Sequence, residues 1–135
     1  MTSIVYAREQ ALGADEFIGV LERSGLSERR PVGDRDRIER MLAHANLVVT
    51  ARADGKLIGV SRALTDFAFC CYLSDLAVDR GHQRSGIGKR LIEETRRLAG
   101  PQATCILLSA PAAIGFYRCI DMPQADNAFV YPRER

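Results

Sequence analysis

The sequence contains no tryptophan and no long apolar run, and both absences exclude classes of protein. Aromatic residues make up 7% of the 135 residues and no basic stripe is present, which argues against a nucleic-acid-binding surface. The formal net charge of +2 is too small to indicate nucleic acid or a membrane as partner. No apolar segment approaches the ~20 residues of a membrane-spanning helix, and the N-terminus lacks the apolar core of a signal peptide. We therefore expect a cytoplasmic protein.

Histidine and cysteine are too few and too irregularly spaced to indicate a metal site or a disulfide framework. The sequence has two histidines and four cysteines, of which Cys70 and Cys71 are adjacent. No Cys-x-x-Cys or Cys/His spacing completes a tetrahedral zinc set. In a strand, the side chains of Cys70 and Cys71 would point to opposite faces. We expect no metal, and reduced cysteines that act as small apolar residues.

The hydrophobic pattern predicts one mixed α/β domain over residues 1–135, with antiparallel strands first and helix crossovers later. Strands are expected at 3–7, on both sides of the Asp54-Gly55 turn in 46–64, at 67–79, at 104–110 and near 127–132. Helices are expected at 14–25, 35–45, 86–99 and 112–119. Asp34 can cap the second helix, and Gly25 can end the first. No repeat or linker divides the chain.

A glycine-containing loop connects the strand that ends at Val78 to the helix expected from residue 86. Residues 85–89 supply the unpaired amides of the first helical turn, where the helix dipole also favours an anion. Gly86 and Gly88 lack a Cβ, which lets a pyrophosphate approach the backbone. Three basic side chains can add positive charge: Arg84, Lys89 and Arg90. The spacing fits neither a Walker loop nor a dinucleotide-binding fingerprint, and a tight turn without a ligand is the alternative.

Two stretches of the chain carry a family resemblance. Residues 83–88, QRSGIG, follow the pattern Gln/Arg-x-x-Gly-x-Gly/Ala within LAVDRGHQRSGIGKRLI, and residues 109–122 read SAPAAIGFYRCIDM. These stretches, with the order of expected elements over nearly the whole chain, resemble the GNAT N-acetyltransferase superfamily. In this sequence Arg80 replaces a common proline, and Asp121-Met122 replaces Gly-Phe. The second change is tolerable because Asp can adopt a left-handed backbone conformation.

The resemblance implies an α/β (α+β) fold, namely a mixed, mostly antiparallel sheet of roughly six to seven strands flanked by about four helices. Splayed central strands would form a cleft for acetyl-CoA. The implied reaction is direct attack of a primary amine on acetyl-CoA in a ternary complex, with a small molecule as the expected acceptor. Acetylation of a protein N-terminus or lysine, and a non-catalytic acyl-CoA-binding module, remain alternatives. Monomer and homodimer are both open. The resemblance assigns cofactor contacts to these residues: Leu76, Ala77, Val78, Gln83, Arg84, Ser85, Gly86, Ile87, Gly88 and Lys89.

The resemblance also suggests catalytic residues. Tyr117 matches the family tyrosine that protonates the departing thiolate, and a core aromatic beside Phe116 is the alternative. In a regular strand, Tyr72 and Ser74 share one face and Asp75 lies on the other. Either a water chain ending at Tyr72 and Ser74 deprotonates the amine, or a bulge redirects Asp75 towards it. A buried structural carboxylate is an equal alternative for Asp75.

The family resemblance places the acceptor site around residues 23–40, RSGLSERRPVGDRDRIER, and the end of the chain. Arg29 and Arg30 could bind a carboxylate or phosphate of the acceptor there. The alternative is a solvated helix face, since arginines and acids nearly balance in this segment. His82 is expected to pack within the glycine loop, and His44 to interact with a helix C-terminus.

Overall fold

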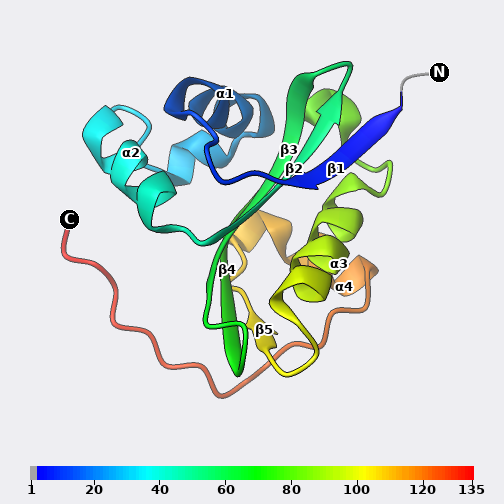
Figure 1. Cartoon of the computed structure of the whole chain (residues 1–135). Helices are drawn as coiled ribbons and strands as arrows, with labels where there is room; N and C mark the ends of the chain where they lie inside the picture. Colours follow the sequence, from blue (N-terminus) through cyan, green and yellow to red (C-terminus); the bar gives the residue numbers. More distant parts are fainter. Residues whose placement is uncertain (1–2) are drawn as a thin grey trace.

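The sheet in the computed structural model is mixed and mostly antiparallel, as expected (Figure 1). The structure describes residues 3–135. The first four strands pair antiparallel in chain order, and the fifth pairs parallel to the fourth. The strands are β1 (Ile4–Arg8), β2 (Leu47–Ala53), β3 (Lys56–Thr65), β4 (Cys70–Val78) and β5 (Thr104–Ile106). The described residues therefore form five strands, and not the six to seven that were expected.

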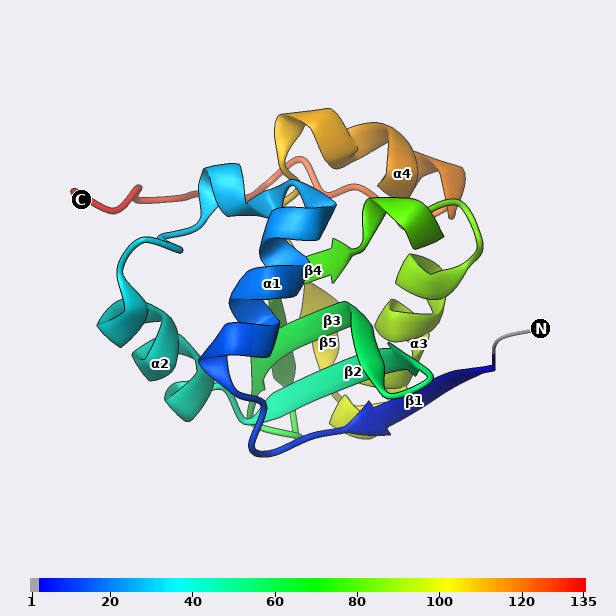
Figure 2. The same cartoon turned by 90° about the horizontal axis from the view of Figure 1, so that it is seen from above.

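The helices cover both faces of this sheet (Figure 2). On one face lie α1 (Ala14–Ser24) and α2 (Arg35–His44), and on the other lie α3 (Ile87–Ala99) and α4 (Ile114–Cys119). Short 3-10 helices occupy three connections: η1 (Leu26–Arg29), η2 (Arg80–His82) and η3 (Pro111–Ala113). Within residues 3–135, no helix combines the length and the apolar character needed to cross a membrane.

Each face of the sheet has its own hydrophobic core. Phe17 and Leu21 of α1 pack with Val60 of β3 in one core, and all three are fully buried. Leu91 of α3 packs with Val49 of β2 in the other core. Burying such side chains contributes about 1.5–3 kcal/mol each, so the two cores hold the helices against the sheet.

β4 changes the direction of its side chains in the middle of the strand. Arg62 of β3 lies opposite Asp75, whereas the next residue of β3 lies opposite Leu73, so Ser74 is an extra residue in a β-bulge. Leu73 accordingly belongs to the core under α3, and Ala77 belongs to the core under α1. The regular alternation that placed Asp75 on the face opposite Ser74 is wrong, because β4 contains a bulge. Both side chains now point to the face covered by α1 and α2, where Arg62 contacts them. The bulge does not free Asp75 to act as a base, since its carboxylate is buried and bound to Arg30 and Arg62.

The strand expected near residues 127–132 is absent, and the strand expected at 104–110 is short. Phe129 and Tyr131 are 98% and 103% exposed, so neither side chain packs against the described residues. The short β5 offers few backbone groups to a sixth strand, and Pro132 has no N–H to donate to a ladder. An unpaired β-prone segment cannot stay a strand by itself, which explains the failed prediction.

The cysteines are free, and the prediction for the adjacent pair is confirmed. Cys70 is exposed and Cys71 is buried, so their side chains point to opposite faces of β4. Cys71 lies opposite Cys105 of β5 in the core under α3. Burial raises the pKa of the Cys71 thiol to about 11, so at neutral pH the thiol is protonated and packs as a small apolar group.

Candidate active site

β4 and β5 separate soon after they begin to pair. The pairs run from Cys70 opposite Thr104 to Tyr72 opposite Ile106, and no pair follows. From residue 73 to Val78, β4 keeps β3 on one edge and has no strand on the other. Backbone groups along this open edge are therefore available to a ligand, apart from the Ser74 and Val78 carbonyls, which already accept from Arg30 and Gln83. The divergence of β4 and β5 agrees with the splayed central strands that the sequence resemblance implied.

The loop after β4 is held in shape by its own polar contacts. Asp79 accepts hydrogen bonds from the Gly81 amide (2.9 Å) and from Nε of Arg23 (2.8 Å). Burial opposes ionisation of Asp79, but these two donors outweigh it and lower the pKa of this carboxyl below its ordinary value. Nε2 of Gln83 donates to the Val78 carbonyl at 2.9 Å. The Gln83 side chain thus shapes the loop, and the Gln83 amide does so too, because it donates to the Arg80 carbonyl at 3.5 Å.

The N-terminus of α3 presents free amides at the end of this loop. No carbonyl or side-chain oxygen among residues 3–135 accepts from the amides of residues 85–89. Gly86 precedes the helix with φ 85°, a left-handed conformation that favours glycine. Arg84 and Lys89 are exposed, and within the described chain neither forms an ion pair with a carboxylate. A helix N-terminus with free amides and unpaired cations is a site for an anion.

Two expected contributors to this anion site are used for packing. A Cβ on Gly86 would meet nothing within 4 Å, so the space beside it is open as predicted. A Cβ on Gly88 would lie 2.8 Å from Cζ of Phe116, so the bare Gly88 accommodates α4 and not a ligand. The Arg90 guanidinium lies 4.9 Å from the centre of the Tyr6 ring. A ligand can therefore approach the backbone at Gly86. The expectation that Gly88 also gives a ligand access to the backbone is wrong.

Tyr117 lies on α4 beside the core under α3. Its ring meets that of Phe116 edge to face with centroids 5.0 Å apart. Burial raises the pKa of the Tyr117 hydroxyl, and the positive charge of Arg30 partly offsets this effect. The hydroxyl is therefore protonated at neutral pH and can act as a proton donor. Its catalytic role stays a prediction.

Asp75 is the only carboxylate among the three β4 residues considered as a base, and it is not free. Asp75 is fully buried, and its two oxygens accept from Nε of Arg30 and Nε of Arg62. The Ser74 hydroxyl accepts from Arg62 at 3.0 Å. Tyr72 is 42% exposed and lies beside the point where β4 and β5 separate. The geometry agrees with the structural alternative for Asp75, which sequence reasoning had left open.

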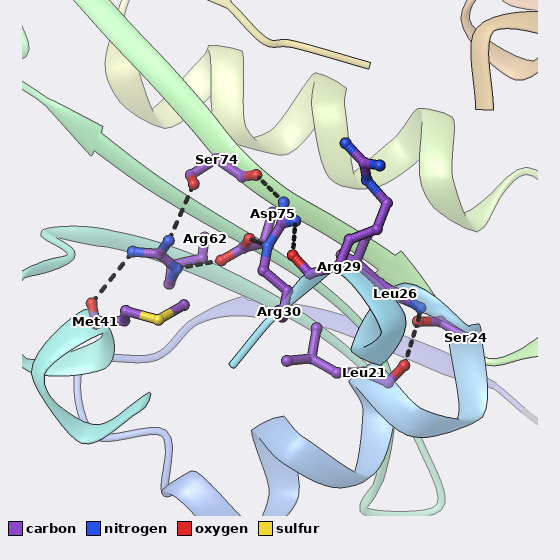
Figure 3. Close-up of polar contacts among 9 residues, drawn as sticks. All are labelled: Leu21, Ser24, Leu26, Arg29, Arg30, Met41, Arg62, Ser74 and Asp75. Atoms are coloured by element: carbon purple, nitrogen blue, oxygen red, sulfur yellow. Dashed lines mark hydrogen bonds and ion pairs between the residues drawn. The ribbon is translucent and has the colours of Figure 1, made fainter. Parts of the chain in front are cut away.

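The pairing of Asp75 also changes the interpretation of the arginine pair. Arg30 is bound to Asp75 and to the Ser74 carbonyl, so it is not free to bind an acceptor anion. Arg29 is exposed, and its side chain points away from Asp75 (Figure 3). Sequence reasoning did not identify Arg62, although an arginine within the apolar strand β3 is a signal of a buried partner.

A pocket of about 910 Å³ lies elsewhere. It is lined by α3, β5, α4 and residues 107–109, 120–125 and 128. Lys89 and Tyr117 reach it, but no residue of β4 does. It therefore lies beyond β5 and apart from the open edge of β4.

Comparison with known proteins agrees with the fold and with the motifs. Residues 14–120 match the family model described as "Acetyltransferase (GNAT) family". The chain belongs to the GNAT acetyltransferase family.

Individual relatives resemble the chain in part of the sequence or in the fold. Over 65 residues it is 38% identical to histone acetyltransferase TAP1 of Glycine max, a match that covers 47% of this chain and 28% of that protein. The GNAT family acetyltransferase SP0256 from Streptococcus pneumoniae TIGR4 matches with a TM-score of 0.73 at 18% identity, over 98% of this chain and 100% of that one. Aminoglycoside N-acetyltransferase AAC(6')-Iy, solved in complex with CoA, matches with a TM-score of 0.74 at 16% identity, over 100% and 97% of the two chains. At such identities the two solved structures show a common fold.

Proposed function

We propose that this chain, as one domain, transfers the acetyl group of acetyl-CoA to a primary amine of a small molecule. The observation that carries the proposal is the continuity of two free backbone surfaces. The open edge of β4 up to Val78 leads into the loop whose end presents the free amides of α3. A ligand with hydrogen-bonding groups along a chain and phosphates at one end fits both surfaces.

Acetyl-CoA has this composition, and the residues present are suited to it. Backbone groups of Leu76, Ala77 and Val78 would hold the acetyl oxygen and the pantetheine arm. The pyrophosphate would lie on the amides of residues 85–89, with Arg84 and Lys89 adding charge. A donor that is well placed for the acetyl oxygen contributes on the order of 3 kcal/mol to lowering the barrier.

In the proposed reaction the amine nitrogen forms a bond to the acetyl carbon and the carbon–sulfur bond breaks. The Tyr117 hydroxyl supplies the proton that the departing thiolate takes up. Because both oxygens of Asp75 are bound to arginines, the ammonium proton leaves through water beside Tyr72 and Ser74. The aminoglycoside acetyltransferase with the same fold supports a small amine as the acceptor class.

Calorimetric titration with acetyl-CoA tests the binding site. Gly86→Glu is expected to weaken binding by at least roughly 100-fold, because it places a carboxylate where the pyrophosphate would lie. Gly55→Glu in the β2–β3 turn is the matched control, since Gly55 also has positive φ (82°) and open space around its Cβ position. Equal loss in both variants, or no binding by the parent chain, would refute the site.

A lysine side chain of a protein is the second candidate acceptor, because the soybean relative is a histone acetyltransferase. The two candidates are separated by measuring thiol release from acetyl-CoA with an aminoglycoside and with a lysine-containing peptide. Faster release with the peptide at equal amine concentration would favour the second candidate.

A further inference from the structure

The cluster formed by Arg30, Arg62 and Asp75 is the most buried charged group that the proposed reaction does not use. The exposed fractions of the three side chains are 21%, 8% and 0%. The members come from the end of η1, from β3 and from β4, so the cluster joins three segments far apart in sequence (Figure 3). We call it the Asp75 cluster.

The Asp75 cluster contains two guanidinium groups and one carboxylate. Within the described chain, neither Arg30 nor Arg62 forms an ion pair with any other acid. Arg62 donates its remaining bonds to neutral oxygens, the Ser74 hydroxyl (3.0 Å) and the Met41 carbonyl (3.3 Å). One positive charge is therefore left uncompensated beside the bulge of β4.

Arg30 is placed to hold the bulge of β4. Its guanidinium donates to Asp75, to the Ser74 carbonyl at 2.8 Å and to the Arg29 carbonyl at 2.8 Å. The first two contacts fix both residues of the bulge at which β4 reverses its faces. Arg30 thus ties the segment after η1 to the backbone of β4 at this point.

We propose that Arg30 is a positioning residue for acetyl transfer, which fixes the β4 bulge through its forked contacts with Asp75 and the Ser74 carbonyl. The turnover arm of this proposal rests on the proposed function, whereas the bulge arm does not. Lysine separates the fork from the charge, because it keeps the charge but cannot form the fork of planar donors.

The bulge arm is tested by amide hydrogen exchange of residues 74–76 of β4 in the ¹⁵N-labelled chain. Arg30→Gln and Arg30→Lys are both expected to speed this exchange by at least roughly tenfold, because neither side chain can form the fork that holds Asp75 and the Ser74 carbonyl. Arg35→Gln on the surface of α2 removes the same charge elsewhere and should leave the exchange unchanged.

The turnover arm is tested by thiol release from acetyl-CoA with an aminoglycoside as the amine. Arg30→Gln and Arg30→Lys are both expected to lower kcat at least roughly tenfold while the Kd for acetyl-CoA changes less than about twofold. Unchanged exchange of residues 74–76 in Arg30→Gln would overturn the bulge arm, even if the chain transferred no acetyl group. Full recovery of kcat by Arg30→Lys, or an equal loss of acetyl-CoA binding, would overturn the forked positioning.

Discussion

Tyr117→Phe is expected to lower kcat for acetyl transfer by roughly 100-fold or more. The substitution removes the hydroxyl but keeps the ring that meets Phe116 edge to face, so the fold and the binding of acetyl-CoA should persist. The measurement is thiol release at saturating acetyl-CoA, together with calorimetric titration of each variant. Because burial raises the pKa of the Tyr117 hydroxyl above its ordinary value, loss of activity through its ionisation is expected at a higher pH than for a free tyrosine.

Tyr131→Phe provides the control for this prediction. Tyr131 is fully exposed on the C-terminal segment, so the substitution removes the same hydroxyl without loss of any packing contact. Its kcat should match that of the parent chain. If Tyr117→Phe were as active as this control, Tyr117 would be a core aromatic and not the proton donor.

Asp75→Ala is expected to lower the free energy of unfolding by about 3–5 kcal/mol. The substitution leaves the Arg30 and Arg62 guanidiniums together in a buried site without their carboxylate, and each then repels the other. Urea denaturation of the parent and the variant measures the difference.

Asp15→Ala is the matched control for the loss of a carboxylate. Asp15 pairs with Arg35 on the surface, where its side chain is 84% exposed, so the free energy of unfolding should change far less. Equal destabilisation by the two substitutions would mean that the Asp75 cluster contributes little to the fold.

Features set by neighbours in sequence could be predicted. Asp34 caps α2 by accepting from the Arg37 amide at 3.1 Å, as its position before a helical pattern indicated. Gly25 ends α1 with φ 88°, and Asp121 adopts φ 58° where the family pattern has glycine. The glycine loop likewise precedes a helix with free amides. In each case the residue type limits its own backbone or supplies a local hydrogen bond, so the prediction needs no knowledge of the fold.

Features set by distant segments could not be predicted. Arg30 and Asp75 are 45 residues apart in sequence, and nothing near either residue identifies the other as its partner. The bulge at Ser74 arises from the pairing of β4 with β3, which alternation within β4 does not reveal. The segment around Phe129 has β-forming residues but no strand to pair with. From the sequence alone Asp75 therefore had several possible roles, and only its contacts with distant residues distinguish between them.

The bulge and the divergence of β5 together limit the shape of any ligand that forms hydrogen bonds with the β4 backbone. Asp75 and Ala77 are covered on one face, and Leu76 and Val78 pack against the core on the other. With β3 on one edge, the remaining edge is the only approach, and it accepts a chain lying in the plane of the sheet. Such a chain must be extended and must carry its own donors and acceptors at intervals that match a strand, about 3.3 Å per residue. The spacing of polar groups along a molecule is therefore a criterion of selection in addition to their chemistry.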